Sequence, residues 1–216
     1  ENNEIIHFVS EMVKSPSADV FASVNVARRT DIKKNHSATH LLHHALRLVL
    51  GSHVEQKGSL VSSEKLRFDF SHFEKISDDQ IKEIESLVQE RIQEQIELQE
   101  WRKMPIDEAK QIGAMALFGE KYGNEVRVVK FGESVELCGG IHVDSTSEIV
   151  GFKIMSESSV ASGIRRVEAL TGKAYSAYVS GALELIDSIN EELAHPKDIL
   201  AAIQKLQNDA SELFRI

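Results

Sequence analysis

The segment from His36 to His40 reads HSATH, and the segment from Cys138 to His142 reads CGGIH. In each segment, two side chains that bind transition metals are separated by three residues. Three imidazoles and one thiolate match the tetrahedral nitrogen and sulfur coordination that Zn²⁺ takes in proteins. The two segments therefore predict one zinc site in two halves, and closing it requires a fold that joins distant parts of the chain.

The composition predicts a soluble globular chain. Of its 216 residues, 42% are hydrophobic and 27% are charged, which is ordinary for such a protein. The single cysteine excludes an internal disulfide and favours a reducing, cytoplasmic location. The apolar run from Leu41 to Leu50 is interrupted by His43, His44 and Arg47, so no membrane contact is expected. The chain begins at Glu1, and we expect it to be a piece of a longer polypeptide.

The charge distribution argues against a chain that binds nucleic acid over its whole surface, because the net charge is −9. Acidic residues concentrate between Glu74 and Glu108. Short basic groups lie before the first histidine and after Gly163: Arg28, Arg29, Lys33, Lys34, Arg165 and Arg166. They either line one basic surface or are scattered surface charges, and from charge alone the second case is the more common one.

Hydrophobic periodicity predicts a strand followed by a long helix at the first ligand pair. Residues 20–26 alternate in the pattern of a half-buried strand. Asp31 is the expected N-cap of the helix and Gly51 its C-cap. His36 and His40 would then lie one turn apart on this helix.

A hairpin and a second helix are expected next. Residues 58–61 and 66–70 flank a polar turn and predict two paired strands. Ser77 and Gln80 form a capping-box pattern, so a helix should follow through Ile92.

The second half predicts further strands and then two helices. Residues 125–131 predict a strand that leads to Cys138. Because glycine disfavours helix, the CGGIH segment is expected to be a turn rather than a helix. Strands are expected at residues 149–155 and 164–170, and helices at 174–193 and 199–214.

The expected fold class is α+β, with a mixed or antiparallel sheet, packed helices, an interdomain zinc-type site and a C-terminal helical arm. We expect three domains. Residues 1–30 would end a preceding small β domain, and residues 31–172 would form a zinc-dependent domain. Residues 173–216 would be a helical linker to a missing C-terminal domain.

Two classes of zinc enzyme do not fit the ligand pattern. A metalloprotease of the HExxH type needs Glu beside the first histidine, where this chain has Ser37. A nucleobase deaminase needs a P-C-x-x-C signature together with H-x-E, and a chain with a single cysteine has no P-C-x-x-C segment. His43 falls on the same helix face as His36 and His40, so it is either a competing ligand or a residue packed under the site.

Six segments of the chain resemble the editing region of alanyl-tRNA synthetases. They are residues 35–43 (NHSATHLLH), 56–61 (QKGSLV), 66–72 (LRFDFSH), 113–123 (GAMALFGEKYG), 136–140 (ELCGG) and 163–169 (GIRRVEA). Threonyl-tRNA synthetases and free-standing AlaX-type trans-editing proteins share both ligand pairs, but the Gly-Gly after Cys138 and the GIRRVEA segment favour the alanyl family. The resemblance runs over nearly the whole chain.

The resemblance implies an aminoacyl-tRNA deacylase that hydrolyses Ser-tRNA(Ala) and Gly-tRNA(Ala). It implies one Zn²⁺ held by the four residues His36, His40, Cys138 and His142. ATP and Mg²⁺ would serve only the missing aminoacylation domain, where the parent enzyme ligates alanine to tRNA(Ala). The expected partners are the acceptor end of tRNA(Ala), contacted by the six basic residues, and the remaining domains of the synthetase.

The resemblance also assigns Gln56 to the editing pocket. Its amide can donate and accept hydrogen bonds, as reading a seryl hydroxyl requires. Thr39 could add a second hydroxyl contact or simply pack. The family usually has Thr where this chain has Ile141. Four protein ligands fill the tetrahedral coordination shell of zinc and leave no open position. Either one ligand is displaced during the reaction, or zinc orders the pocket. We favour zinc that polarises or positions the substrate end, with water as the nucleophile.

Two alternatives stay open at this point. A free-standing trans-editing deacylase would share the chemistry, although the predicted helical arm argues for the synthetase. A non-catalytic zinc-stabilised module would bind tRNA without hydrolysing the ester.

Overall fold

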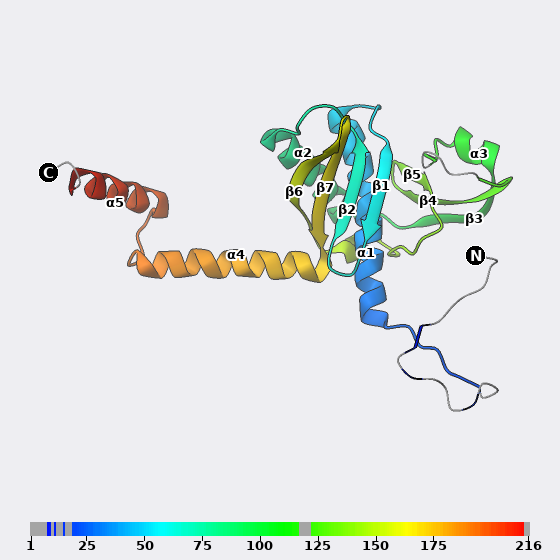
Figure 1. Ribbon diagram of the computed structural model, residues 1–216, viewed down its shortest axis with the longest axis horizontal. Helices are drawn as coiled ribbons and strands as arrows, with labels where there is room; N and C mark the ends of the chain where they lie inside the picture. The colour runs from blue at the N-terminus through cyan, green and yellow to red at the C-terminus, as the bar shows by residue number, and fades with distance from the viewer. Residues whose placement is uncertain (1–7, 10, 12–14, 16–18, 117–121, 214–216) are drawn as a thin grey trace.

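Two antiparallel sheets organise the chain (Figure 1). The computed structural model describes residues 8, 9, 11, 15, 19–116 and 122–213, so residues 117–121 of the GAMALFGEKYG motif lie outside it. The four-stranded sheet has the order β1 (Gln56–Val61), β2 (Leu66–Ser71), β7 (Ile164–Thr171) and β6 (Phe152–Ala161). The three-stranded sheet has the order β3 (Gln99–Pro105), β4 (Glu125–Phe131) and β5 (Ser134–Leu137). The α+β class is confirmed, with both sheets antiparallel.

The helix α1 (Val26–Leu50) carries the first ligand pair and begins earlier than expected. Its N-cap is Asn25, whose side-chain oxygen accepts a hydrogen bond from the Arg28 backbone N–H at 3.0 Å. The expected Asp31 cap is therefore wrong, and so is the expected strand, because residues 20–25 form no regular structure. Alternation alone makes no strand without a neighbouring strand to pair with, and Phe21 and Val24 are exposed here.

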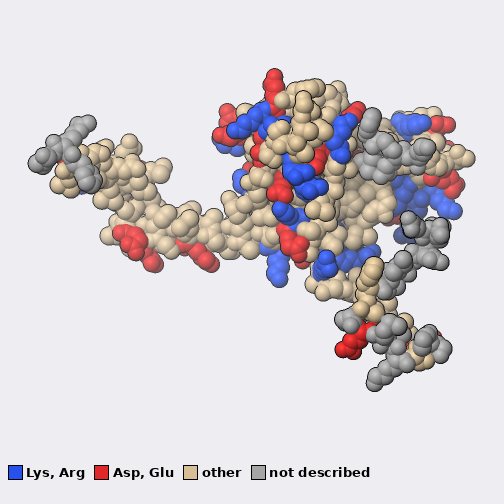
Figure 2. Space-filling model, in the orientation of Figure 1, with Lys and Arg blue, Asp and Glu red and all other residues tan. Residues whose placement is uncertain are grey.

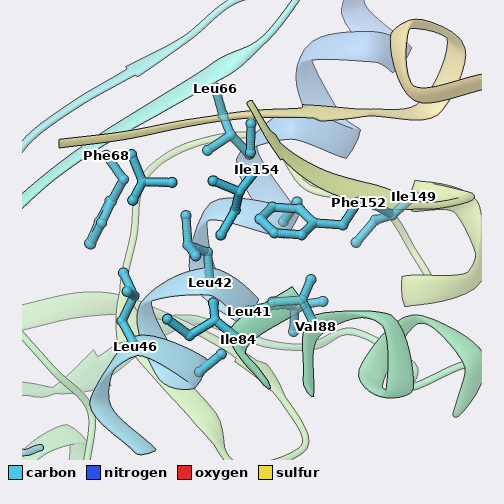
Figure 3. Packing of buried hydrophobic residues seen from close by; sticks show 14 of the residues in the cluster. Leu41, Leu42, Leu46, Leu66, Phe68, Ile84, Val88, Ile149, Phe152 and Ile154 are labelled. Atoms are coloured by element: carbon cyan, nitrogen blue, oxygen red, sulfur yellow. The ribbon is translucent and has the colours of Figure 1, made fainter. Parts of the chain in front are cut away.

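A hydrophobic core holds α1 in place against the four-stranded sheet (Figure 3). Leu42 and Leu46 of α1 meet Phe68 of β2 and Ile154 of β6. The helix α2 (Asp78–Gln93) adds Ile84 to the same cluster. Burying each of these side chains contributes about 1.5–3 kcal/mol, so the ligand helix has little freedom to move.

The capping box that begins α2 and the hairpin of β1 and β2 are confirmed. The Ser77 hydroxyl accepts from the Gln80 N–H at 3.2 Å, and the Ser77 N–H donates to the Gln80 side chain at 3.0 Å. Both features are local in sequence, which is why the sequence predicts them well.

The three-stranded sheet delivers the second ligand pair. The prediction of β4 is confirmed, and the CGGIH segment is an irregular loop as expected. The strands β3 and β5 and the short helix α3 (Ile106–Gln111) were not expected from the sequence. β3 is an edge strand with mostly exposed residues, and β5 has only four residues, so neither shows a readable periodicity.

The hairpin of β6 and β7 completes the four-stranded sheet. β7 is confirmed, but β6 starts at Phe152, three residues later than expected. Ile149 ends a short 3₁₀ helix, η1 (Thr146–Ile149), and Val150 has a φ of 73°. This left-handed residue turns the chain before the strand can begin.

Two helices form the C-terminal arm (Figure 1). α4 (Gly172–Glu192) follows β7 and projects away from the sheets, and α5 (Ile199–Leu213) lies at its far end. The expected helices are confirmed, apart from residue 214, which lies outside the described residues. No described helix is both long and apolar enough to cross a membrane. The division into three domains stays a prediction.

Candidate metal centre

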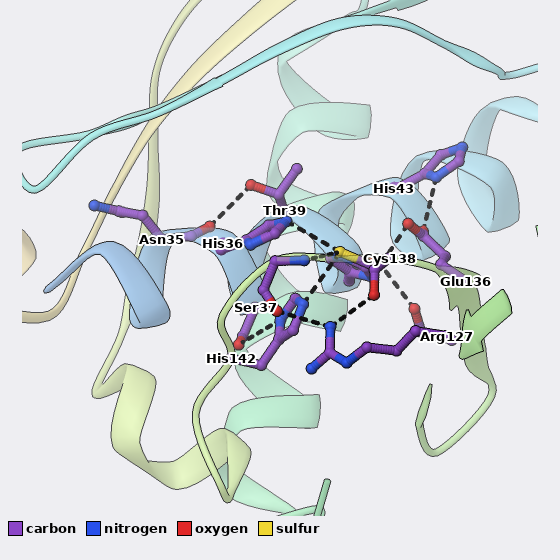
Figure 4. Close-up of polar contacts among 12 residues, drawn as sticks. Asn35, His36, Ser37, Thr39, His43, Arg127, Glu136, Cys138 and His142 are labelled. Atoms are coloured by element: carbon purple, nitrogen blue, oxygen red, sulfur yellow. Dashed lines mark hydrogen bonds and ion pairs between the residues drawn. The ribbon is translucent and has the colours of Figure 1, made fainter. Parts of the chain in front are cut away.

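The four predicted ligands meet in one cluster (Figure 4). His36 and His40 come from α1, and Cys138 and His142 come from the loop after β5. One ligand atom from each residue lies within 4.8 Å of all the others. The Cys138 Sγ lies 3.5 Å from His36 Nε2 and 3.3 Å from His142 Nε2. Folding therefore brings together two pairs that are far apart in sequence.

Gly140 makes room for the first histidine. A Cβ atom at this position would lie 2.0 Å from His36 Cε1 and 2.5 Å from His36 Nδ1. A Cβ at the neighbouring Gly139 would meet nothing within 4 Å. The two glycines thus have different roles, because only Gly140 lies against a ligand ring.

Arg127 of β4 holds the loop from Cys138 to His142, called the ligand loop, through its backbone oxygens. Its Nη1 donates to the backbone oxygens of Cys138 at 2.6 Å and Gly140 at 2.7 Å. Its Nε donates to Glu100 Oε1 at 3.0 Å. The sequence reasoning missed this residue, because the strand EVRVVKF also contains Glu125 and Lys130 and its pattern does not single out Arg127.

A second layer of hydrogen bonds orients the imidazoles. Glu136 of β5 lies 3.1 Å from His40 Nδ1 through one oxygen and 2.9 Å from His43 Nδ1 through the other. The Ser37 hydroxyl lies 3.2 Å from His142 Nδ1 and accepts the Val143 N–H at 3.1 Å. Contacts at Nδ1 of His40 and His142 leave Nε2 of these two rings for a metal, which is the usual arrangement around bound zinc.

The electrostatics of the cluster also suit metal binding. Burial, and next the nearby His40, lower the pKa of His36 to about 4. Burial also lowers the pKa of His40 and of His142. Burial opposes ionisation of Glu136, but the neighbouring His40 and His43 hold its pKa below the ordinary value. The imidazoles are therefore neutral at physiological pH, the form that binds metal, so the donor set fits Zn²⁺.

His43 is not one of the four ligands. The group that could hold a metal contains His36, His40, Cys138 and His142, while His43 Nδ1 faces Glu136. This geometry favours the second of the two readings, a residue packed beside the site. Glu136, which the sequence reasoning missed, joins His43 to His40.

The two predicted pocket residues have different surroundings. Gln56 lines a cavity of about 190 Å³ together with His43, Arg47, Val54, Glu55, Met115, Ala116 and Glu136. The Thr39 hydroxyl is buried and donates to the Asn35 backbone oxygen at 2.8 Å, and Thr39 is not among the residues that line this cavity. Glu136 connects the cavity to the ligand cluster, because it lines the cavity and its carboxylate lies 3.1 Å from His40 Nδ1.

The six basic residues do not form one patch. Arg28, Arg29, Lys33 and Lys34 lie on α1, and Lys33 lines an open hollow of about 410 Å³ beside His142. Lys34 lies against Gly172, at the end of β7 opposite to Arg165 and Arg166, so roughly 20 Å of strand separates the two groups.

Arg165 and Arg166 are already paired with carboxylates. Arg165 pairs with Glu157, and Arg166 binds both oxygens of Asp69, at 2.7 and 2.8 Å. On the face shown in Figure 2, basic and acidic side chains intermingle over the sheets. The role of Arg165, Arg166 and the four basic residues of α1 in tRNA binding stays a prediction.

Comparison with known proteins places the second ligand pair in a recognised domain. Residues 126–168 match the family model described as the threonyl and alanyl tRNA synthetase second additional domain. The matched segment contains Cys138 and His142, whereas His36 and His40 lie outside it.

Longer relatives match the whole chain. The chain is 53% identical over 213 residues to an alanine–tRNA ligase of Flavobacterium psychrophilum, covering 99% of this chain and 24% of the relative. It is 50% identical over 215 residues to the alanine–tRNA ligase of Christiangramia forsetii, covering 100% of this chain and 25% of the relative. It is 49% identical over 212 residues to the alanine–tRNA ligase of Porphyromonas gingivalis, covering 98% of this chain and 24% of the relative. The chain thus spans about a quarter of the length of these relatives.

Proposed function

The chain belongs to the alanyl-tRNA synthetase family, and we propose that it carries the site that removes wrongly attached amino acids from tRNA(Ala). In this proposal, the site hydrolyses the ester of Ser-tRNA(Ala) and Gly-tRNA(Ala). The parent enzyme would ligate alanine to tRNA(Ala) with ATP and Mg²⁺ in another domain. Identity of 50–53% to alanine–tRNA ligases over nearly the whole chain favours a synthetase segment over a free-standing deacylase.

One observation carries the proposal. Three imidazoles and one thiol converge near a small cavity, and the Glu136 carboxylate both lines this cavity and contacts His40. A cavity of about 190 Å³ suits a small aminoacyl group rather than a large side chain. Gln56 lies in its wall, where an amide can bond to a seryl hydroxyl.

The chemistry of the amino acids explains why such a site is needed. A pocket shaped for alanine cannot exclude the smaller glycine. It rejects an added hydroxyl only weakly, with discrimination of roughly 100-fold. A second, hydrolytic site must supply the remaining accuracy.

His36, His40, Cys138 and His142 would hold the Zn²⁺. When bound, Zn²⁺ would supply a fixed positive charge that polarises or positions the substrate end. The protein itself supplies the neutral imidazoles, the narrow cavity and the Glu136 link between them.

Deacylation assays on the zinc-loaded chain test the proposal. Ser-tRNA(Ala) and Gly-tRNA(Ala) should lose their amino acid, while Ala-tRNA(Ala) should be stable. The Cys138→Ala variant should bind less zinc and lose this activity. Binding of tRNA(Ala) without ester hydrolysis would instead support a non-catalytic RNA-binding module and refute the proposal.

A further inference from the structure

His43 has one nitrogen whose partner the fold does not supply. The residue is 4% exposed, and Nδ1 lies 2.9 Å from Glu136 Oε1. Nε2 is buried and has no hydrogen-bond partner among the described residues. Figure 4 shows this nitrogen on the side of the ring that faces away from Glu136. Burying an unpaired polar atom costs about 1–3 kcal/mol, so a position of this kind needs an explanation.

The cavity beside His43 contains few groups that can take up a proton. The Arg47 guanidinium has no lone pair to offer and caps the backbone oxygens of Ser52 and Val54. The exposed Glu55 is paired with Lys57. Glu136 accepts both histidine N–H groups, and an amide such as Gln56 is not a base. Among the described residues that line the cavity, this leaves the His43 ring, whose Nε2 has no partner, as the remaining base.

We propose that His43 is the general base of the editing reaction and that Glu136 orients it. A carboxylate that accepts the Nδ1–H leaves Nε2 as the acceptor and stabilises the imidazolium that forms later. This inference rests on the proposed function, because it needs an ester in the cavity. It adds a reacting group that is separate from the four metal ligands.

The proposed step balances as an ester hydrolysis. A water molecule gives one proton to His43 Nε2 while its oxygen bonds to the ester carbonyl carbon. The bond from that carbon to the ribose oxygen of the tRNA then breaks. The imidazolium returns its proton to the ribose oxygen, so the products are the free amino acid and a tRNA with an intact terminal hydroxyl.

Within the described part of the chain, the charged and titratable groups around His43 come from three segments. They are His40, His44 and Arg47 of α1, Glu55 before β1, and Glu136 of β5. Glu136 is the group that contacts the ring directly, at 2.9 Å.

The His43→Asn variant separates the two nitrogens. The Asn amide can replace the Nδ1–H bond to Glu136, but it offers nothing in place of Nε2. We expect zinc content and melting temperature to stay near wild type, while the rate of Ser-tRNA(Ala) deacylation falls roughly 100-fold or more. The rise of the wild-type rate with pH should disappear in this variant. Added imidazole should restore part of the rate to His43→Ala.

The outcomes distinguish this inference from the proposed function. A wild-type chain that fails to hydrolyse Ser-tRNA(Ala) would refute the proposed function itself. An active wild type with an equally active His43→Asn would refute the general base alone. Loss of zinc in His43→Asn, with no rescue of His43→Ala by imidazole, would also refute it and leave His43 as a residue that only positions Glu136.

Discussion

Gly140→Ala should disrupt the metal site through a single methyl group. The new Cβ would lie 2.0 Å from His36 Cε1, whereas carbon atoms in ordinary contact are about 3.5 Å apart or more. The ring or the loop must therefore move by about 1.5 Å. The loop resists movement because Arg127 holds the backbone oxygens of Cys138 and Gly140. The His36 ring is the group that gives way.

The size of the effect follows from the tolerance of zinc coordination. Ligand distances hold within about 0.2 Å, so a shift of about 1.5 Å removes His36 from the shell. Zinc binding by four ligands contributes roughly 10–16 kcal/mol at neutral pH. One ligand of four then accounts for about 3 kcal/mol, or roughly a 100-fold loss of affinity.

Competition with a chromogenic chelator measures the affinity, and Gly139→Ala is the matched control. A Cβ at Gly139 meets nothing within 4 Å, so this variant should bind zinc like the wild type. Zinc should also raise the melting temperature of Gly139→Ala more than that of Gly140→Ala. Equal zinc affinity for the two variants would show that His36 does not ligate the metal, and the argument from the glycine contact would fail.

Three other changes test the surroundings of the site. Arg127→Gln should lower zinc affinity about tenfold, measured by the same competition, because the loop loses its hydrogen bonds. Changing Arg165 and Arg166 to Ala should weaken tRNA binding and flatten its salt dependence. An unchanged salt slope with a lower melting temperature would show instead that both residues stabilise the sheet, where Asp69 would lose its partner Arg166. Gln56→His should reduce the rate of Ser-tRNA(Ala) deacylation about tenfold, which corresponds to about 1.4 kcal/mol of activation free energy. The rate with Gly-tRNA(Ala) should fall less, because glycine has no hydroxyl. Equal losses with both substrates would indicate that Gln56 positions the water instead.

The ligand pairs could be predicted because each is local in sequence. His36 and His40 are one helical turn apart, and the glycines after Cys138 exclude a helix there. The capping box at Ser77 is local in the same way. Short-range patterns of this kind depend little on the rest of the fold.

The start of α1 shows where local pattern fails. Residues 20–26 alternate like a strand, but an alternating segment becomes a strand only where another strand accepts its hydrogen bonds. The described chain offers none there, and Asn25 caps a helix instead. The preference of Asn for N-cap positions was the competing signal, six residues before the expected cap at Asp31.

Glu136 shows why the residues around the ligands were harder to find. It lies two residues before Cys138 in a strand whose four residues are all buried. A buried carboxylate needs partners, and its partners, His40 and His43, come from a helix more than ninety positions earlier, with 93 separating His43 from Glu136. No local spacing encodes that contact. An acidic residue flanked by apolar ones next to a predicted ligand is still a usable signal, since its burial demands a cation or an N–H donor nearby. In this chain Glu136 connects the predicted ligand His40 to His43 and to the cavity wall.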